Sequence, residues 1–319
     1  MGPELLRFVL FRLLTAIPLL LAVSLVAFTL LRLVPGDVAI ELAGPLASPE
    51  ELDRIQRQLG LDRPFLEQMV TWYSALAQGD LGQSFLLKRG VTEAIIERLP
   101  VTLSLTGLAL LFSVILGVTL GTVAAMKHGT RTDQLLMTGA VLGLSFADFW
   151  LGLALIYALS VSMGWFPSGG YVPFARDPAE WLWHLTIPAI TLALTQMGFL
   201  ARMTRSSMLE VLRQDFIRTA RAKGVPERIV IMKHALSNAL IPVVTVIGLT
   251  TGILLSGAVV IEQVFSLPGV GRLIVGSIVR RDYPVVQGAL LFTASIFLCV
   301  NILVDVLYAA LDPRVRHAT

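Results

Sequence analysis

Residues 208–242 read MLEVLRQDFIRTARAKGVPERIVIMKHALSNALIP, a basic and helix-prone segment that Gly224-Val225-Pro226 interrupts once. The uncharged runs on its two sides, at 181–201 and 234–261, are each long enough to cross a bilayer. The chain therefore keeps one sizeable polar insertion on a single side of a membrane. Such an insertion is a natural place for a soluble partner to bind.

The composition is that of an integral membrane protein. Of the 319 residues, 55% are hydrophobic and 15% are charged, against roughly 25% charged in an average soluble domain. The mean hydropathy is +0.77. The single cysteine, Cys299, excludes an internal disulfide. Because the histidines and methionines are not clustered in a ligand spacing, we expect no metal site.

Runs without a charged side chain predict an all-α membrane protein with six transmembrane helices. The runs cover residues 13–31, 99–126, 134–175 (interrupted only by Asp148), 181–201, 234–261 and 283–304. Each can supply the roughly 20 apolar residues that a spanning helix needs. The third run is too long for one helix, so the part beyond Met163 is expected to be a loop. The first run is longer than a signal-peptide core and lacks a small-residue cleavage site, so we expect it to be retained.

The distribution of basic residues predicts the orientation. Residues 202–234 hold eight Lys or Arg and three Asp or Glu, whereas the short loops on the other side are nearly neutral. Lys and Arg are enriched in cytoplasmic loops. We therefore place the 208–242 segment and both termini in the cytoplasm.

Three parts are expected along the chain: residues 1–35 with the first span, an insert at 36–98, and residues 99–319 with the remaining five spans. The insert lies outside the membrane on the extracytoplasmic side. Ser48-Pro49-Glu50-Glu51 is a capping box with proline at the first helical position, and Gly60 fits a helix end. A second short helix is expected from Pro64, so the insert is helical.

Asp148 is chemically the most unusual position, because it lies near the middle of the third run. Ionisable groups at that depth face a partner or a water-filled path. Two interpretations stay open: Asp148 caps a helix break or pairs with a polar neighbour, or it lines a translocation path together with Gln196 and Met197. With Asp305 it would also permit an intramembrane aspartyl hydrolase, a distant alternative.

The loop after the fifth run has a defined shape, because it is rich in proline and glycine. An outer gate, a docking surface for an external protein, and an ordinary loop between helices all fit it. The residues assigned to a gate or docking surface are Glu262, Phe265, Pro268, Gly269, Arg272, Arg281, Asp282 and Tyr283.

Residues 208–224, the first half of the 208–242 segment, are predicted to form one amphipathic helix. Its apolar side chains at 209, 212, 216 and 220 share a face, and Gly224 followed by Pro226 ends it. A basic amphipathic helix can lie on anionic lipid. It can equally insert into the groove of a partner protein.

The string Arg218-Thr219-Ala220-Arg221-Ala222-Lys223-Gly224, followed by HALSNA at 234–239 and by Pro242, resembles a known cytoplasmic signature. It is similar to that of the membrane permeases of binding-protein-dependent ABC importers, in the dipeptide, oligopeptide and nickel branch. RLVPGD at 32–37, GDLG at 79–82 and LDPR at 311–314 also look like family positions. At Ala147-Asp148 the chain departs from the Ser-x-Pro that relatives show.

This resemblance implies a type I ABC importer permease with six spans and no catalytic activity of its own. It implies a paralogous permease, two cytoplasmic ATPase subunits and an extracytoplasmic substrate-binding protein as partners in the bacterial plasma (inner) membrane, with no nucleic acid. The solute would be short peptides, with nickel or another small solute as the alternative. ATP and Mg²⁺ would bind the partner ATPases, since this chain has no Gly-x-x-x-x-Gly-Lys-Ser/Thr loop and is expected to hold no cofactor.

The resemblance makes 208–224 the coupling helix that sits in a groove of an ATPase. The residues assigned to coupling are Met208, Leu209, Leu212, Asp215, Phe216, Arg218, Thr219, Ala220, Arg221, Ala222, Lys223 and Gly224.

Overall fold

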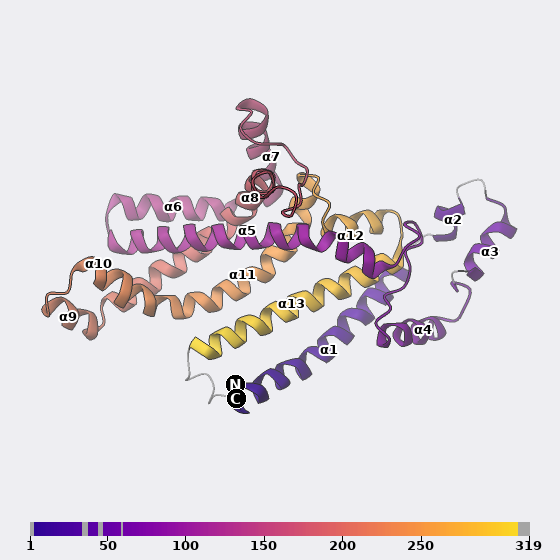
Figure 1. Ribbon diagram of the computed structural model, residues 1–319, viewed down its shortest axis with the longest axis horizontal. Helices are drawn as coiled ribbons and strands as arrows, with labels where there is room; N and C mark the ends of the chain where they lie inside the picture. Colours follow the sequence, from indigo (N-terminus) through magenta and orange to yellow (C-terminus); the bar gives the residue numbers. More distant parts are fainter. Residues whose placement is uncertain (1–2, 34–37, 44–46, 59, 312–319) are drawn as a thin grey trace. The chain divides into compact units, whose positions relative to one another are not determined.

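The computed structural model describes residues 3–33, 38–43, 47–58 and 60–311, and most of this part is helical (Figure 1). The chain folds as two compact units. Unit 1 comprises Met1–Arg12, Val101–Leu267 and Cys299–Thr319, and unit 2 comprises Leu13–Pro100 and Pro268–Leu298.

The helices follow one another along the chain with short connections. They are α1 (Pro3–Leu33), α2 (Val38–Ala43), α3 (Pro49–Gln58), α4 (Phe65–Ala77), α5 (Val91–Met126), α6 (Arg131–Ser145), α7 (Asp148–Leu155), η1 (Ile156–Ser162), α8 (Pro178–Leu212), α9 (Asp215–Ala222), α10 (Glu227–Ile229), η2 (Val230–Ala235), α11 (Leu236–Val264), α12 (Val270–Val279) and α13 (Tyr283–Leu311). The elements η1 and η2 are π-helical turns that continue α7 and lead into α11.

The helix lengths agree with the six predicted spans. Among the described residues, five helical segments are long and apolar enough to cross a membrane: Arg12–Thr29, Val91–Met126, Pro178–Leu212, Glu227–Val264 and Tyr283–Leu303. The pair Arg131–Ser145 and Asp148–Ser162 passes the same test together and, counted as one bent span, brings the number to six.

The third span is broken, which the uncharged run did not predict. Its two helical segments meet at an angle of 105°. Phe146 and Ala147 between them have extended backbones, with ψ of 139° and 136°. Asp148 is the first residue of α7, where a carboxylate is favourable because the helix N-terminus carries partial positive charge. The helical part ends at Ser162, so the prediction of a loop beyond Met163 is correct.

The core of unit 1 is built by α5, α8 and α11. Their buried side chains form one cluster with Leu105, Leu192 and Leu254, each at most 2% exposed. Helices α5 and α8 approach closely because α5 presents glycine: a Cβ on Gly121 would lie 2.5 Å from the carbonyl oxygen of Ala201. Small residues at such contacts let membrane helices pack backbone to backbone.

Unit 2 has its own core, built from α12 and the first turns of α5 and α13. Buried Ile95, Leu273 and Val285 belong to this cluster. A loop from the insert is fastened to it by Asp282, which is 1% exposed. The Asp282 carboxylate accepts hydrogen bonds from the Ser84 hydroxyl and from the backbone N–H groups of 85 and 86.

The helical signals of the insert are where the sequence placed them. The Ser48 hydroxyl accepts a hydrogen bond from the N–H of Glu51 at 3.3 Å, so it caps α3. Gly60 has φ +65°, a left-handed conformation that glycine adopts without strain. The second helix, α4, begins at Phe65, directly after Pro64.

Candidate coupling site and translocation path

The predicted coupling segment forms two helices instead of one. Met208, Leu209 and Leu212 belong to the end of α8, and a separate helix, α9, covers Asp215–Ala222. Between them Gln214 has an extended backbone, with ψ 149°. The expectation of a single helix over 208–224 is therefore wrong. Neither glycine nor proline stands at 213 or 214, so the sequence carries no local signal for this break.

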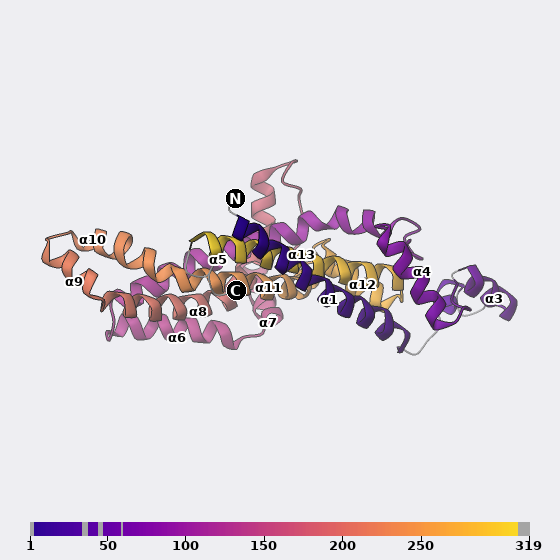
Figure 2. The ribbon, with the colours of Figure 1, turned by 90° about the horizontal axis from the view of Figure 1, so that it is seen from below.

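Helix α9 is anchored in unit 1 by Ile217, which is completely buried. Ile217 packs in one cluster with Ala125 at the end of α5, Met208 in α8, and Val230 and Ala235 in η2. Figures 1 and 2 show α9 and α10 at the end of unit 1 where the turn between α5 and α6 also lies. A displacement of α9 would thus press on three membrane-spanning segments at once.

The break divides the predicted apolar face, of which Leu209, Leu212 and Ala220 are partly buried against this cluster. Phe216, which shares the predicted face, is 46% exposed, as expected of a side chain that meets lipid or a partner. A new helix begins at Asp215, and in this helix the side chain of Ile217 points into the same cluster as Ala220. The sequence analysis did not select Ile217, because the side of α9 on which it lies can be assigned only when the break before Asp215 is known.

A glycine ends α9 in the predicted place. Gly224 has φ +74°, and its N–H bonds the carbonyl of Arg221 while the N–H of Val225 bonds that of Ala220. This pair of bonds is the Schellman motif, with Val225 and Ala220 also packed on the shared cluster. The guanidinium of Arg221 donates to both oxygens of Glu227, at 3.1 and 2.6 Å, and these hydrogen bonds raise the pKa of Arg221.

The outer side of α9 is available to a partner. Its exposed residues from the predicted set are Asp215, Phe216, Arg218, Thr219, Arg221, Ala222, Lys223 and Gly224. One large aromatic side chain surrounded by charged and small residues is the composition of a protein-binding face. A short helix with a buried inner side and such an outer side can transmit movement from a soluble partner.

A buried ion pair that the sequence did not suggest lies near this anchor. Asp133, in the first turn of α6, has a side chain that is 5% exposed and accepts bonds from Arg205 of α8 at 2.6 and 2.7 Å. The N–H of Gly129 and the ring of His128 complete its surroundings, at 3.0 and 3.4 Å. This pair fixes the turn between α5 and α6 to α8, one turn before Met208.

The residues assigned to the translocation path lie in unit 1. Asp148 stands at the α6–α7 bend, and a Cβ on Gly257 of α11 would lie 3.5 Å from its Oδ2. Its Oδ1 is buried without a hydrogen-bond partner among the described residues. Met197 is 9% exposed, and Gln196 is half-buried beside it in α8. The structure thus assigns Asp148 to a helix break, and its role in a path stays a prediction.

The residues assigned to an outer gate divide between the two units. In unit 1, Glu262 and Phe265 are completely buried. Glu262 accepts a bond from the Thr102 hydroxyl at 2.5 Å. The carbonyl of Phe265 accepts one from the N–H of Gly170, which fastens the loop after η1. These two residues hold the structure together and do not present a surface.

In unit 2 the remaining gate residues surround α12. Pro268 and Gly269 precede this helix and Arg272 lies exposed in its first turn. Arg281 and Asp282 belong to its connection to α13, which begins at Tyr283, and Arg281 has φ +57°. Because Asp282 is buried, it positions a loop and offers no free carboxylate to an external protein.

Two further predictions concern chemistry. No group of three or more metal-ligating side chains occurs among the described residues. Asp305, the second carboxylate of the hydrolase alternative, lies in α13, and its side chain lies outside the described part of the chain.

Comparison with known proteins extends over almost the whole chain. Residues 117–317 match the family described as binding-protein-dependent transport system inner membrane component, and residues 5–106 match the N-terminal part of such a membrane component. A peptide transport system permease protein of Brucella abortus is 51% identical over 302 residues, covering 95% of this chain and 96% of that protein.

A second relative and a solved structure are also similar to this chain. The glutathione transport system permease protein of Escherichia coli O6:H1 is 43% identical over 312 residues, covering 98% of this chain and 99% of that protein. The MetNI methionine ABC transporter in inward-facing form matches in fold, with a TM-score of 0.59 and 17% identity, over 69% of this chain and 97% of that chain. The chain has the type I ABC importer permease fold and belongs to the family of binding-protein-dependent transport system inner membrane components.

Proposed function

We propose that this chain is the non-catalytic permease subunit of an ATP-driven importer of short peptides. It forms the path together with a second, paralogous permease, receives peptides from an extracytoplasmic binding protein, and is driven by two cytoplasmic ATPase subunits that bind ATP and Mg²⁺. Family membership and the names of the similar peptide and glutathione permeases support this assignment.

The observation that supports the proposal is that α9 has one exposed side and one buried side. Its outer side is exposed around Phe216, while Ile217 on its inner side is buried among α5, α8 and η2. The excess of basic residues in 202–234 supports a cytoplasmic position for this end of unit 1, where ATPases are, and for both termini. Closure of the ATPases would move α9, and its anchor would pass that movement to the spans.

Replacing Phe216 with glutamate tests the coupling role in the assembled transporter. We expect Phe216→Glu to lower peptide uptake into proteoliposomes by about tenfold or more, because aromatic side chains at the centre of a contact contribute most of its binding energy. ATP hydrolysis should no longer respond to the peptide-loaded binding protein.

The matched control is Met126→Glu, an equally drastic change at the end of α5, where the side chain is 54% exposed. It should leave uptake and the stimulation of ATP hydrolysis close to those of the unaltered transporter. Full coupling in the Phe216→Glu transporter would refute the assignment of α9 as the coupling helix.

A further inference from the structure

Unit 2 contains a cleft of about 660 Å³ between the insert, the end of α1 and the first turn of α13. Three of its described lining residues, Arg57, Arg63 and Lys88, are cationic, and none of the described lining residues is acidic. Aromatic rings of Phe28 and Trp72 form part of the wall. The cleft therefore offers positive charge beside an apolar surface.

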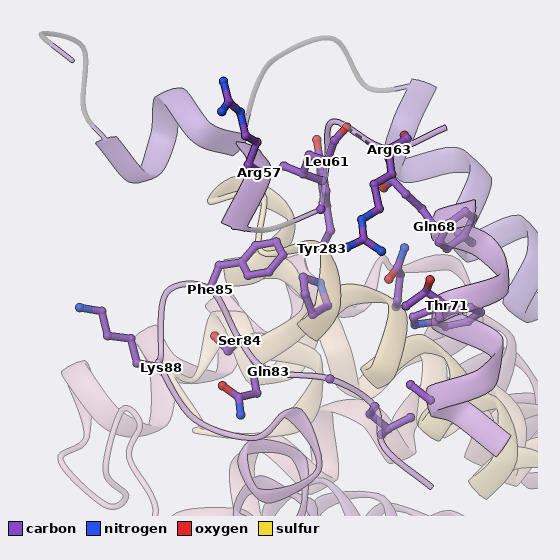
Figure 3. Close-up of a pocket in the computed structure, with 18 residues that line it drawn as sticks. Arg57, Leu61, Arg63, Gln68, Thr71, Gln83, Ser84, Phe85, Lys88 and Tyr283 are labelled. Atoms are coloured by element: carbon purple, nitrogen blue, oxygen red, sulfur yellow. Dashed lines mark hydrogen bonds between the residues drawn. The ribbon is translucent and has the colours of Figure 1, made fainter. Parts of the chain in front are cut away.

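Arg63 is the cation best placed to bind a ligand in this cleft. Figure 3 shows its guanidinium pointing into the cleft, whereas Arg57 points away and Lys88 lies at the rim. Its Nη1 bonds Glu67 at 3.2 Å, and a guanidinium has five N–H donors, so most remain for an anion. Amide and hydroxyl groups of Gln68 and Thr71 lie on the same wall.

The contacts between α4 and α1 place α4 beside the apolar window of α1. The Tyr73 hydroxyl is 2.9 Å from that of Ser24, and the ring of Phe28 lies 5.4 Å from that of Phe65 and 5.5 Å from that of Trp72. Ser24 and Phe28 both belong to the apolar window of α1, Arg12–Thr29. Helix α4 therefore packs against the last turns of this apolar window of α1.

One flank of α4 beside its contact with α1 is apolar and exposed, while Glu67, Thr71 and Ser74 are exposed farther from α1. Leu66 and Val70, one turn apart, are 66% and 65% exposed, and Glu67 is the one charged residue of the helix. On α1 at the same level, Leu25 and Val26 are 48% and 53% exposed. These surfaces fit lipid chains, and Trp and Tyr beside them are typical of the membrane–water interface.

We propose that the cleft binds the headgroup of an anionic phospholipid of the extracytoplasmic leaflet. The phosphate would meet Arg63, with Lys88 at the rim, and the acyl chains would lie over Leu66 and Val70. Arginine presents several N–H donors to phosphate oxygens in one plane. A soluble anion would use the same cations, but it would leave the adjoining apolar surface of α4 without a role. The second helix of the insert is then a membrane-interface helix.

Native mass spectrometry of the full-length chain tests the headgroup site. In micelles holding equal amounts of phosphatidylglycerol and phosphatidylcholine, the unaltered chain should retain phosphatidylglycerol preferentially. Arg63→Gln should weaken that retention about fivefold or more, because each cation near an anionic lipid contributes about one such factor. Arg63→Lys, which keeps the charge, should retain more of it.

The control variant is Arg54→Gln, a change at an exposed arginine of α3 that does not line the cleft. It should leave lipid retention unchanged, and equal unfolding midpoints should show that the variants are folded. Equal retention of the two lipids by the unaltered chain, or equal loss in Arg54→Gln and Arg63→Gln, would overturn the proposal. Displacement of the lipid by soluble glycerol 3-phosphate would show instead a site for a free anion.

A labelling experiment tests the position of α4 separately. In a full-length Cys299→Ser background, Val70→Cys should react slowly with a membrane-impermeant maleimide in proteoliposomes. Glu50→Cys on α3, also exposed, should react fast. Equal reaction rates at the two positions would place α4 in water and contradict the lipid site.

Discussion

At the scale of single residues, the pair of Asp133 and Arg205 joins α6 to α8 by two hydrogen bonds of 2.6 and 2.7 Å. The two residues are 72 positions apart, and both oxygens of Asp133 accept bonds from one guanidinium. A buried ion pair adds little beyond what apolar packing gives, but removal of one partner leaves a buried charge and costs far more. The contribution of this ion pair to stability is therefore tested by replacing one of its two residues.

We expect Asp133→Asn to destabilise the chain by about 3 kcal/mol, because Arg205 would lose its carboxylate partner in a buried place. The unfolding midpoint in detergent measures this change. The same substitution at the exposed pair of Asp53 and Arg57, which lie 3.9 Å apart with side chains 66% and 73% exposed, should cost at most about 1 kcal/mol. Equal losses in the two variants would contradict a structural role for the buried pair.

At the scale of helices, close approach of α5 and α8 depends on glycines that have no room for a side chain. A Cβ on Gly121 would lie 2.5 Å from a backbone oxygen of α8, and one on Gly117 would lie 2.7 Å from Leu200. A Cβ on Gly139 of α6 would meet nothing within 4 Å. The same residue type in neighbouring spans therefore plays different roles, which the spacing of small residues alone does not reveal.

Substitution by alanine should separate these roles. Gly121→Ala should destabilise the chain by about 1–3 kcal/mol, because it forces α5 away from α8. Gly139→Ala should be neutral or slightly stabilising, since alanine loses less conformational entropy in a helix. Both are measured by the unfolding midpoint, and a larger loss at Gly139 would show that the helices pack differently.

The sequence predicted those features of the helices that depend on local chemistry. The cap at Ser48, the helix end at Gly224 and the lengths of the spans all follow from residue type and hydropathy. A helix break at Asp148 was one of two interpretations that the sequence left open, whereas the break at Gln214 was not predicted. The extended residues at these two places, Phe146, Ala147 and Gln214, are neither glycine nor proline.

At the scale of the whole molecule, the sequence predicted which segment forms the candidate coupling site but not which contacts connect it to the spans. Hydropathy and charge placed a basic helix at one end of the spans, and the signature string assigned it to coupling. Which side chain connects it to the spans depends on the burial of Ile217 against α5, α8 and η2. Because these contacts join residues that are far apart in sequence, no pattern within 208–224 contains them.

The last prediction concerns how movement passes through the molecule. If α9 moves the spans through Ile217, Ile217→Ala should lower peptide uptake by the assembled transporter while basal ATP hydrolysis persists. The truncated side chain leaves a cavity between α9 and the spans, which costs about 2–4 kcal/mol of stability. Ile229→Ala, the same change at a side chain of α10 that is 44% exposed, should leave uptake nearly unaltered. The quantity to measure is the ratio of peptides imported to ATP hydrolysed. Contacts between two sites show coupling only when a mutation among them changes that ratio. An unchanged ratio in Ile217→Ala would mean that the movement reaches the spans by contacts other than this anchor.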